Sequence, residues 1–93
     1  MVGDHNSRDE SVDQNLIDEY IELDPDRPVL SEARLARYGV PVWALVGYLE
    51  AVDGNETCVA EAYEVPVDAV RAAIAYYRLQ KPLIDARLAA NAA

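Results

Sequence analysis

The sequence from residue 41 onward repeats its apolar side chains with a helical period, and short breaks divide that pattern. In the first segment, four apolar side chains recur at i, i+3, i+4 and i+7, the spacing of one helix face: Val42, Leu45, Val46 and Leu49. Pro41 suits the first position of this helix. Asp53-Gly54-Asn55 ends it, because glycine supplies a left-handed C-cap and Asn55 can cap the next helix. The pattern predicts consecutive helices from Pro41, Glu56 and Val67.

The second and third of these helices have the outline of a helix-turn-helix over residues 56–79. A short helix at 56–63 is followed by the turn Glu64-Val65-Pro66 and a longer helix at 67–79. In such a motif the second helix enters the major groove of DNA. Arginine can pair with guanine and alanine can touch a thymine methyl group. The candidate DNA-contacting residues on the predicted outward face of that helix are Asp68, Arg71, Ala72, Ala75 and Arg78.

The charge of the chain opposes strong DNA binding. The net charge is −9, from 17 Asp and Glu against 8 Lys and Arg. A nucleic-acid-binding protein usually carries a basic face, since phosphate contacts supply much of its affinity. Arg71 and Arg78 can equally be solvated side chains of an ordinary bundle helix. The charge therefore favours a basic protein partner, or DNA binding only within an assembly.

The N-terminal part of the chain is polar and acidic. Residues 1–15 cannot bury enough apolar area to offset the entropy of ordering, so we expect a mobile acidic tail followed by one helical domain over 16–93. Residues 16–23 predict a helical turn that runs into a short extended piece. An extended arm at 35–40 is expected to pair with residues 20–23.

Gln80-Lys81-Pro82 is expected to end the third helix, because the residue before a proline disfavours helical geometry. A fourth helix is expected over Leu83 to Asn91, with Ile84 and Leu88 on its inner face. The fold class is therefore mainly α, a helix-turn-helix bundle with a short N-terminal extended or β arm.

The thin, alanine-rich core of a 93-residue chain favours pairing with another subunit, so we expect a homodimer. Aromatic side chains at helical spacing usually belong to a core, and Tyr63 and Tyr77 fall on predicted inner faces. Candidate interface residues are Trp43, Tyr48 and Tyr76.

Few residues are available for chemistry. His5 is the only histidine and Cys58 the only cysteine, so we expect no disulfide, no metal site and no cofactor. Without the usual groups of an active site, the chain is not expected to be an enzyme. Cys58 is expected to be a small buried or half-buried hydrophobic residue. The sequence shows neither a signal peptide nor an apolar run of the ~20 residues that span a membrane, so a cytoplasmic location is expected.

Ten or so positions of the chain resemble a family of small bacterial proteins catalogued as domain of unknown function 433. The resemblance covers roughly residues 20–80 and lies in four stretches: Val40 to Ala51, Val59 to Tyr63, Val65-Pro66 and Val70 to Tyr77. The family usually carries Gly-Thr-Arg before its Ile-Pro-Val, where this chain has Arg37-Tyr38-Gly39.

The resemblance implies homeodomain-like helices preceded by short strands, in an antitoxin-like protein that binds a PIN-like ribonuclease toxin, with operator DNA as a second ligand. An antitoxin can cover a basic cleft with carboxylates. The acidic candidates for this role are residues 1–26 and the outer faces of the helices at 41–52 and 56–63. The alternative is a protein-interaction or dimerisation module that does not bind DNA.

Overall fold

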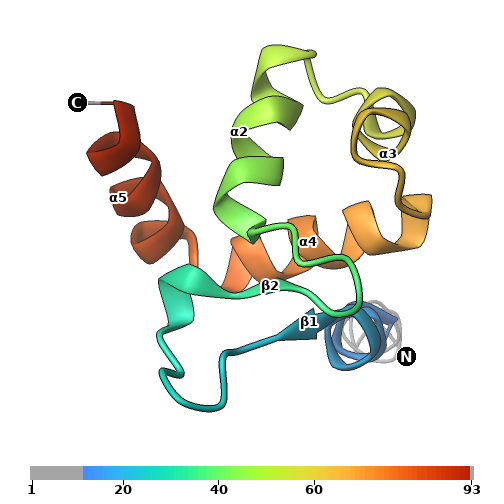
Figure 1. Ribbon diagram of the computed structural model, residues 1–93. Helices are drawn as coiled ribbons and strands as arrows, with labels where there is room; N and C mark the ends of the chain where they lie inside the picture. Colours follow the sequence, from blue (N-terminus) through green and yellow to red (C-terminus); the bar gives the residue numbers. More distant parts are fainter. Residues whose placement is uncertain (1–11, 93) are drawn as a thin grey trace, which may run out of the picture.

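Helices form most of the chain in the computed structural model, which describes residues 12–92, and the predicted fold class is confirmed. Figure 1 shows α2 and α3 on one side of α4, with α5 beside α2. In chain order the elements are an N-terminal helix (12–20), β1 (Ile21–Glu22), the 3-10 helix η1 (Leu30–Glu32), β2 (Arg34–Leu35), α2 (Val42–Ala51), α3 (Glu56–Tyr63), α4 (Val67–Leu79) and α5 (Lys81–Ala92).

The core lies where α2, α3, α4 and α5 meet the β1–β2 region. Most of the predicted inner faces are confirmed: Leu45 and Val46 of α2, Val59 of α3 and Val70 of α4 are all buried. Tyr63, Ile74 and Tyr77 are half-buried and pack around this core. The six largest fully buried side chains come from five elements: Leu35, Val42, Leu45, Val59, Val70 and Ile84.

The turns of the helix-turn-helix form as their residues predict. Gly54 has φ +80°, a conformation that a glycine tolerates at a helix end. The Asn55 side chain caps α3 by accepting a hydrogen bond of 3.0 Å from the backbone N–H of Cys58. Glu64 ends α3 in the left-handed conformation, with φ +57°, and Pro66 precedes α4. The predicted bounds of α3 and α4 are confirmed.

The β arm is shorter than expected. β1 and β2 are antiparallel, with Ile21 opposite Leu35 and Glu22 opposite Arg34. The expectation of an extended arm over 35–40 is wrong beyond Leu35, because the chain turns there. Arg37 and Gly39 both have positive φ, and the N–H of Gly39 donates to the Leu35 carbonyl at 2.8 Å.

The N-terminal helix corrects the expected domain boundary. Residues 12–15, assigned to a mobile tail, are helical, and residues 1–11 lie outside the described part of the chain. The helix has an apolar side, because Ile17 and Tyr20, three residues apart, both pack against the core. The ordered unit therefore includes residues on the polar side of the predicted boundary at residue 16.

Two helix starts differ from expectation by one or two residues. Pro41 caps α2 from the position before it, instead of being the first helical residue. α5 begins at Lys81, so only Gln80 separates it from α4, and the expected start at Leu83 is wrong. Pro82 is tolerated because its missing N–H falls in the first turn. Ile84 is fully buried as predicted.

A close contact seats α5 against α2. A Cβ atom added at Gly47 would lie 3.1 Å from Cδ2 of Leu88, so glycine leaves room for this half-buried leucine. Ile84 is buried in the core and Leu88 packs against it, so α5 belongs to the same core although it lies outside the region of family resemblance.

Candidate protein-interaction surface

The predicted reader face of α4 is partly covered. Ala72 is 0 % exposed and Ala75 is 3 % exposed, so the prediction that they contact DNA is wrong for this conformation. The N-terminal helix lies beside this face at Ala75. Its residues Asp13, Gln14 and Ile17 line a cavity of about 270 Å³ together with Ala75, Arg78 and Leu79 of α4.

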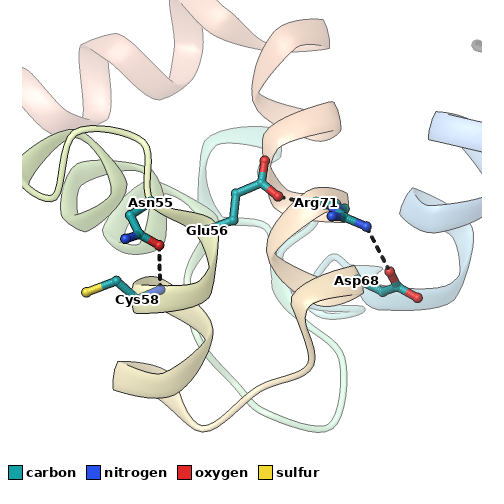
Figure 2. Close-up of polar contacts among 5 residues, drawn as sticks. All are labelled: Asn55, Glu56, Cys58, Asp68 and Arg71. Carbon is teal, nitrogen blue, oxygen red and sulfur yellow. Dashed lines mark hydrogen bonds and ion pairs between the residues drawn. The ribbon is translucent and has the colours of Figure 1, made fainter.

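The two arginines of the predicted reader stripe differ in their surroundings. Figure 2 shows that Arg71 lies between Glu56 of α3 and Asp68 of α4. Its Nε lies 3.1 Å from Glu56 Oε1 and its Nη1 lies 3.8 Å from Asp68 Oδ1. Arg78 is exposed and forms no ion pair among the described residues. The helix-turn-helix therefore presents one arginine already matched by carboxylates and one that is not.

The three aromatic interface candidates differ in how far their side chains are exposed. Tyr76 is buried, at 7 % exposed, and its hydroxyl donates a 2.7 Å hydrogen bond to the Leu30 carbonyl, so its assignment to an interface is wrong. Burial also raises the pKa of this hydroxyl, which keeps it protonated as a donor. The ring of Trp43 is half-buried and covered by the guanidinium of Arg87, 4.2 Å from the ring centroid.

Tyr48 remains accessible at the junction of α2 and α3. It is 36 % exposed and meets Tyr63 edge to face, with ring centroids 5.8 Å apart. The nearby Cys58 thiol raises the pKa of the Tyr48 hydroxyl, with desolvation adding to the effect. Cys58 is half-buried, as predicted.

Carboxylates dominate the surface around this junction. The sequence contains no Lys or Arg between Arg37 and Arg71. Four carboxylate side chains between residues 50 and 64 are exposed and form no ion pair among residues 12–92. We call residues 50–64 the acidic α2–α3 segment, and its four unpaired carboxylates are Glu50, Asp53, Glu61 and Glu64.

The exposed, unpaired carboxylates of the helices predicted at 41–52 and 56–63 all lie within this segment. Its side chains come from the end of α2, the following turn and α3, which Figure 1 places side by side. Because no basic neighbour neutralises these four side chains, the segment presents a negative potential to solvent.

Within residues 12–92, no three potential metal ligands of the His, Cys, Asp or Glu type gather at one place. None of the described helices has the length and apolar character needed to cross a membrane. The four unpaired carboxylates of the acidic α2–α3 segment are the exposed charged groups at the junction of α2 and α3.

Comparisons of the chain with protein-family models, curated proteins and solved structures find no match. The resemblance to the domain of unknown function 433 family therefore depends on the positions quoted above.

Proposed function

We propose that this chain is an antitoxin-like helix-turn-helix protein whose acidic α2–α3 segment binds a basic protein. The family resemblance supplies the class of partner, a PIN-like ribonuclease toxin. The main support for the proposal is the set of four exposed carboxylates between residues 50 and 64 that form no ion pair among the described residues. Such a surface complements a cationic RNA-binding cleft.

The aromatic side chain beside these carboxylates supports a protein partner. Tyr48 is 36 % exposed and lies against Tyr63, so a rigid aromatic ring stands next to the acidic groups. Tyrosine is enriched in protein interfaces because it combines a large apolar ring with a hydroxyl group. Charge then sets the approach of the partner, and the ring supplies an apolar contact.

Operator DNA is the weaker ligand in this proposal. Two of the five candidate contacts on α4 are buried, and Arg71 is paired with Glu56 and Asp68. DNA contact through α4 requires the N-terminal helix to move and Arg71 to exchange its partners. This cover favours the second candidate function, an interaction or dimerisation module that does not bind DNA.

The test is a calorimetric titration of the full chain with the purified product of the neighbouring reading frame. We expect a complex whose affinity falls as salt rises, because the contacts are between exposed charges. The double variant Glu61→Gln, Glu64→Gln should raise Kd at least about tenfold, which corresponds to ~1.4 kcal/mol.

The comparison variant removes two charges from residues 1–26, the other acidic candidate for binding the toxin, which this proposal leaves outside the binding surface. Asp18 and Glu19 are exposed on the N-terminal helix, and the double variant Asp18→Asn, Glu19→Gln should leave Kd within about twofold. Equal losses in the two double variants would show that binding does not depend on residues 50–64 in particular and would refute the assignment of the segment. Absence of any complex would refute the antitoxin-like function.

A further inference from the structure

A second surface feature lies away from the helix-turn-helix. A cleft of about 580 Å³ is lined by residues of the 24–41 region and by Arg87 of α5. Its volume falls within the usual range for small-molecule sites. Three of its lining side chains are arginines, although the chain as a whole carries a net charge of −9: Arg27, Arg34 and Arg87.

Two of the three arginines are held in place through one nitrogen each. Nε of Arg34 lies 2.7 Å from Glu22 Oε2, across the β1–β2 pair. Nε of Arg87 lies 2.7 Å from Glu32 Oε2, which joins α5 to η1. Arg87 also lies over the ring of Trp43. These contacts reduce the freedom that a long side chain loses when it binds a ligand.

The terminal nitrogens of these side chains are left without acceptors. Among the described residues, no hydrogen bond engages the Nη atoms of Arg34 or Arg87, and neither a hydrogen bond nor an ion pair engages the side chain of Arg27. A guanidinium carries five N–H donors, so each Nε contact leaves four N–H groups unused. Planar pairs of such donors match the two oxygens of a carboxylate or phosphate.

The carboxylates of the cleft do not cancel this donor set. Glu32 accepts from Nε of Arg87, and Asp24 Oδ1 accepts from the backbone N–H of Asp26 at 2.9 Å. Both therefore have roles within the chain. Each of these carboxylates keeps one oxygen without a partner, so the three arginines offer more unused N–H donors than the cleft has unused carboxylate oxygens, which favours a ligand rich in acceptor oxygens.

We propose that this cleft binds a small ligand through its phosphate or carboxylate oxygens, with Arg27, Arg34 and Arg87 as the recognising side chains. None of these residues belongs to α3 or α4, so the site is separate from the proposed protein-binding surface. The two assignments can fail independently.

The fluorescence of Trp43 tests the proposal directly, because this residue is the only tryptophan and contacts Arg87. The full chain is titrated with sodium pyrophosphate and, in a parallel series, with sodium citrate, both at constant ionic strength. Calorimetry provides a second measurement that does not depend on the indole. We expect saturable binding of at least one probe. Binding of one probe alone identifies the phosphate or carboxylate source.

Three variants test which groups bind the probe. Arg27→Ala and Arg87→Lys should each weaken binding at least about fivefold to tenfold, because lysine keeps the charge but lacks the planar pair of donors. Arg78 is exposed on α4 and lies outside the cleft, so Arg78→Lys should bind the probe as tightly as the unaltered protein. Circular dichroism checks that each variant is folded. If Arg87→Lys does not fold, the affinity of Arg27→Ala alone tests the proposal.

Two results would overturn the proposed ligand site. No saturation by either probe below roughly 10 mM would overturn the proposal, since a Kd of that size corresponds to less than ~3 kcal/mol of binding. Equal affinity in all three variants would also overturn it, because binding would then reflect general charge and not these arginines.

Discussion

The substitution Ala72→Leu separates a covered α4 from an exposed reader helix. Ala72 is 0 % exposed, so a larger side chain there must displace the packed atoms around it. Adding atoms to a filled core typically costs about 1–3 kcal/mol. Each kcal/mol lowers Tm by roughly 4–8 °C in a domain of this size, so Tm should fall by at least about 4 °C.

The same substitution at Ala62 is the matched control. Ala62 is exposed on α3, and leucine and alanine differ little in helix propensity, so Ala62→Leu should change stability by less than ~0.5 kcal/mol. Urea unfolding followed by circular dichroism measures both variants, with the slope m used to check two-state behaviour. If the two variants were equally stable, α4 would not be covered at Ala72, and the reasoning about the reader face would be refuted.

Three further predictions follow from individual contacts. Tyr76→Phe removes the hydrogen bond to the Leu30 carbonyl and should destabilise the fold by about 1 kcal/mol in urea unfolding, whereas the exposed Tyr38→Phe should have no measurable effect. Asn55→Ala removes the α3 cap and should lower the free energy of unfolding by about 1 kcal/mol, whereas Asn55→Asp should keep most of the stability that the cap provides. Hydrogen bonds from Lys81 and Tyr77 lower the pKa of Asp85, so its contribution is present above the unfolded pKa of about 4 and is lost as pH falls through the folded value. Asp85→Asn should therefore flatten the dependence of the urea midpoint on pH in the acid range, and an unchanged dependence would contradict this assignment.

The helix-turn-helix could be located from sequence because its signals are local. Asn55 caps α3 three residues from its partner Cys58, and Pro66 directly precedes α4. Such contacts span a few residues, so the residue types alone define the helix ends. The bounds 56–63 and 67–79 follow from them.

The faces of α4 could not be assigned in the same way. The larger side chains Val70, Ile74 and Tyr77 suggest one inner face, but Ala72 and Ala75 are buried as well. Alanine occurs on both exposed and buried helix faces, so it carries little information about burial. Part of this second face lies beside the N-terminal helix, whose Ile17 lines the same cavity as Ala75 although it lies 58 residues earlier in the chain.

Tyr76 and the arginine cleft were missed for a related reason. The acceptor for the Tyr76 hydroxyl is the carbonyl of Leu30, 46 residues away. The cleft joins Arg27 and Arg34 to Arg87, whose partner Glu32 is 55 residues distant. Contacts of this kind are set by the packing of α5 and η1, and no spacing in the sequence encodes them.

The most direct test of the central claim compares two ligands for the same protein. Fluorescence anisotropy over a salt series measures its binding to the product of the neighbouring reading frame and to duplex DNA from its own upstream region. We expect the chain to bind the protein, to bind it more weakly in the double variant Glu61→Gln, Glu64→Gln, and to show no comparable binding to DNA. Tight DNA binding by the unaltered protein, lost in Arg71→Ala and Arg78→Ala, would contradict it.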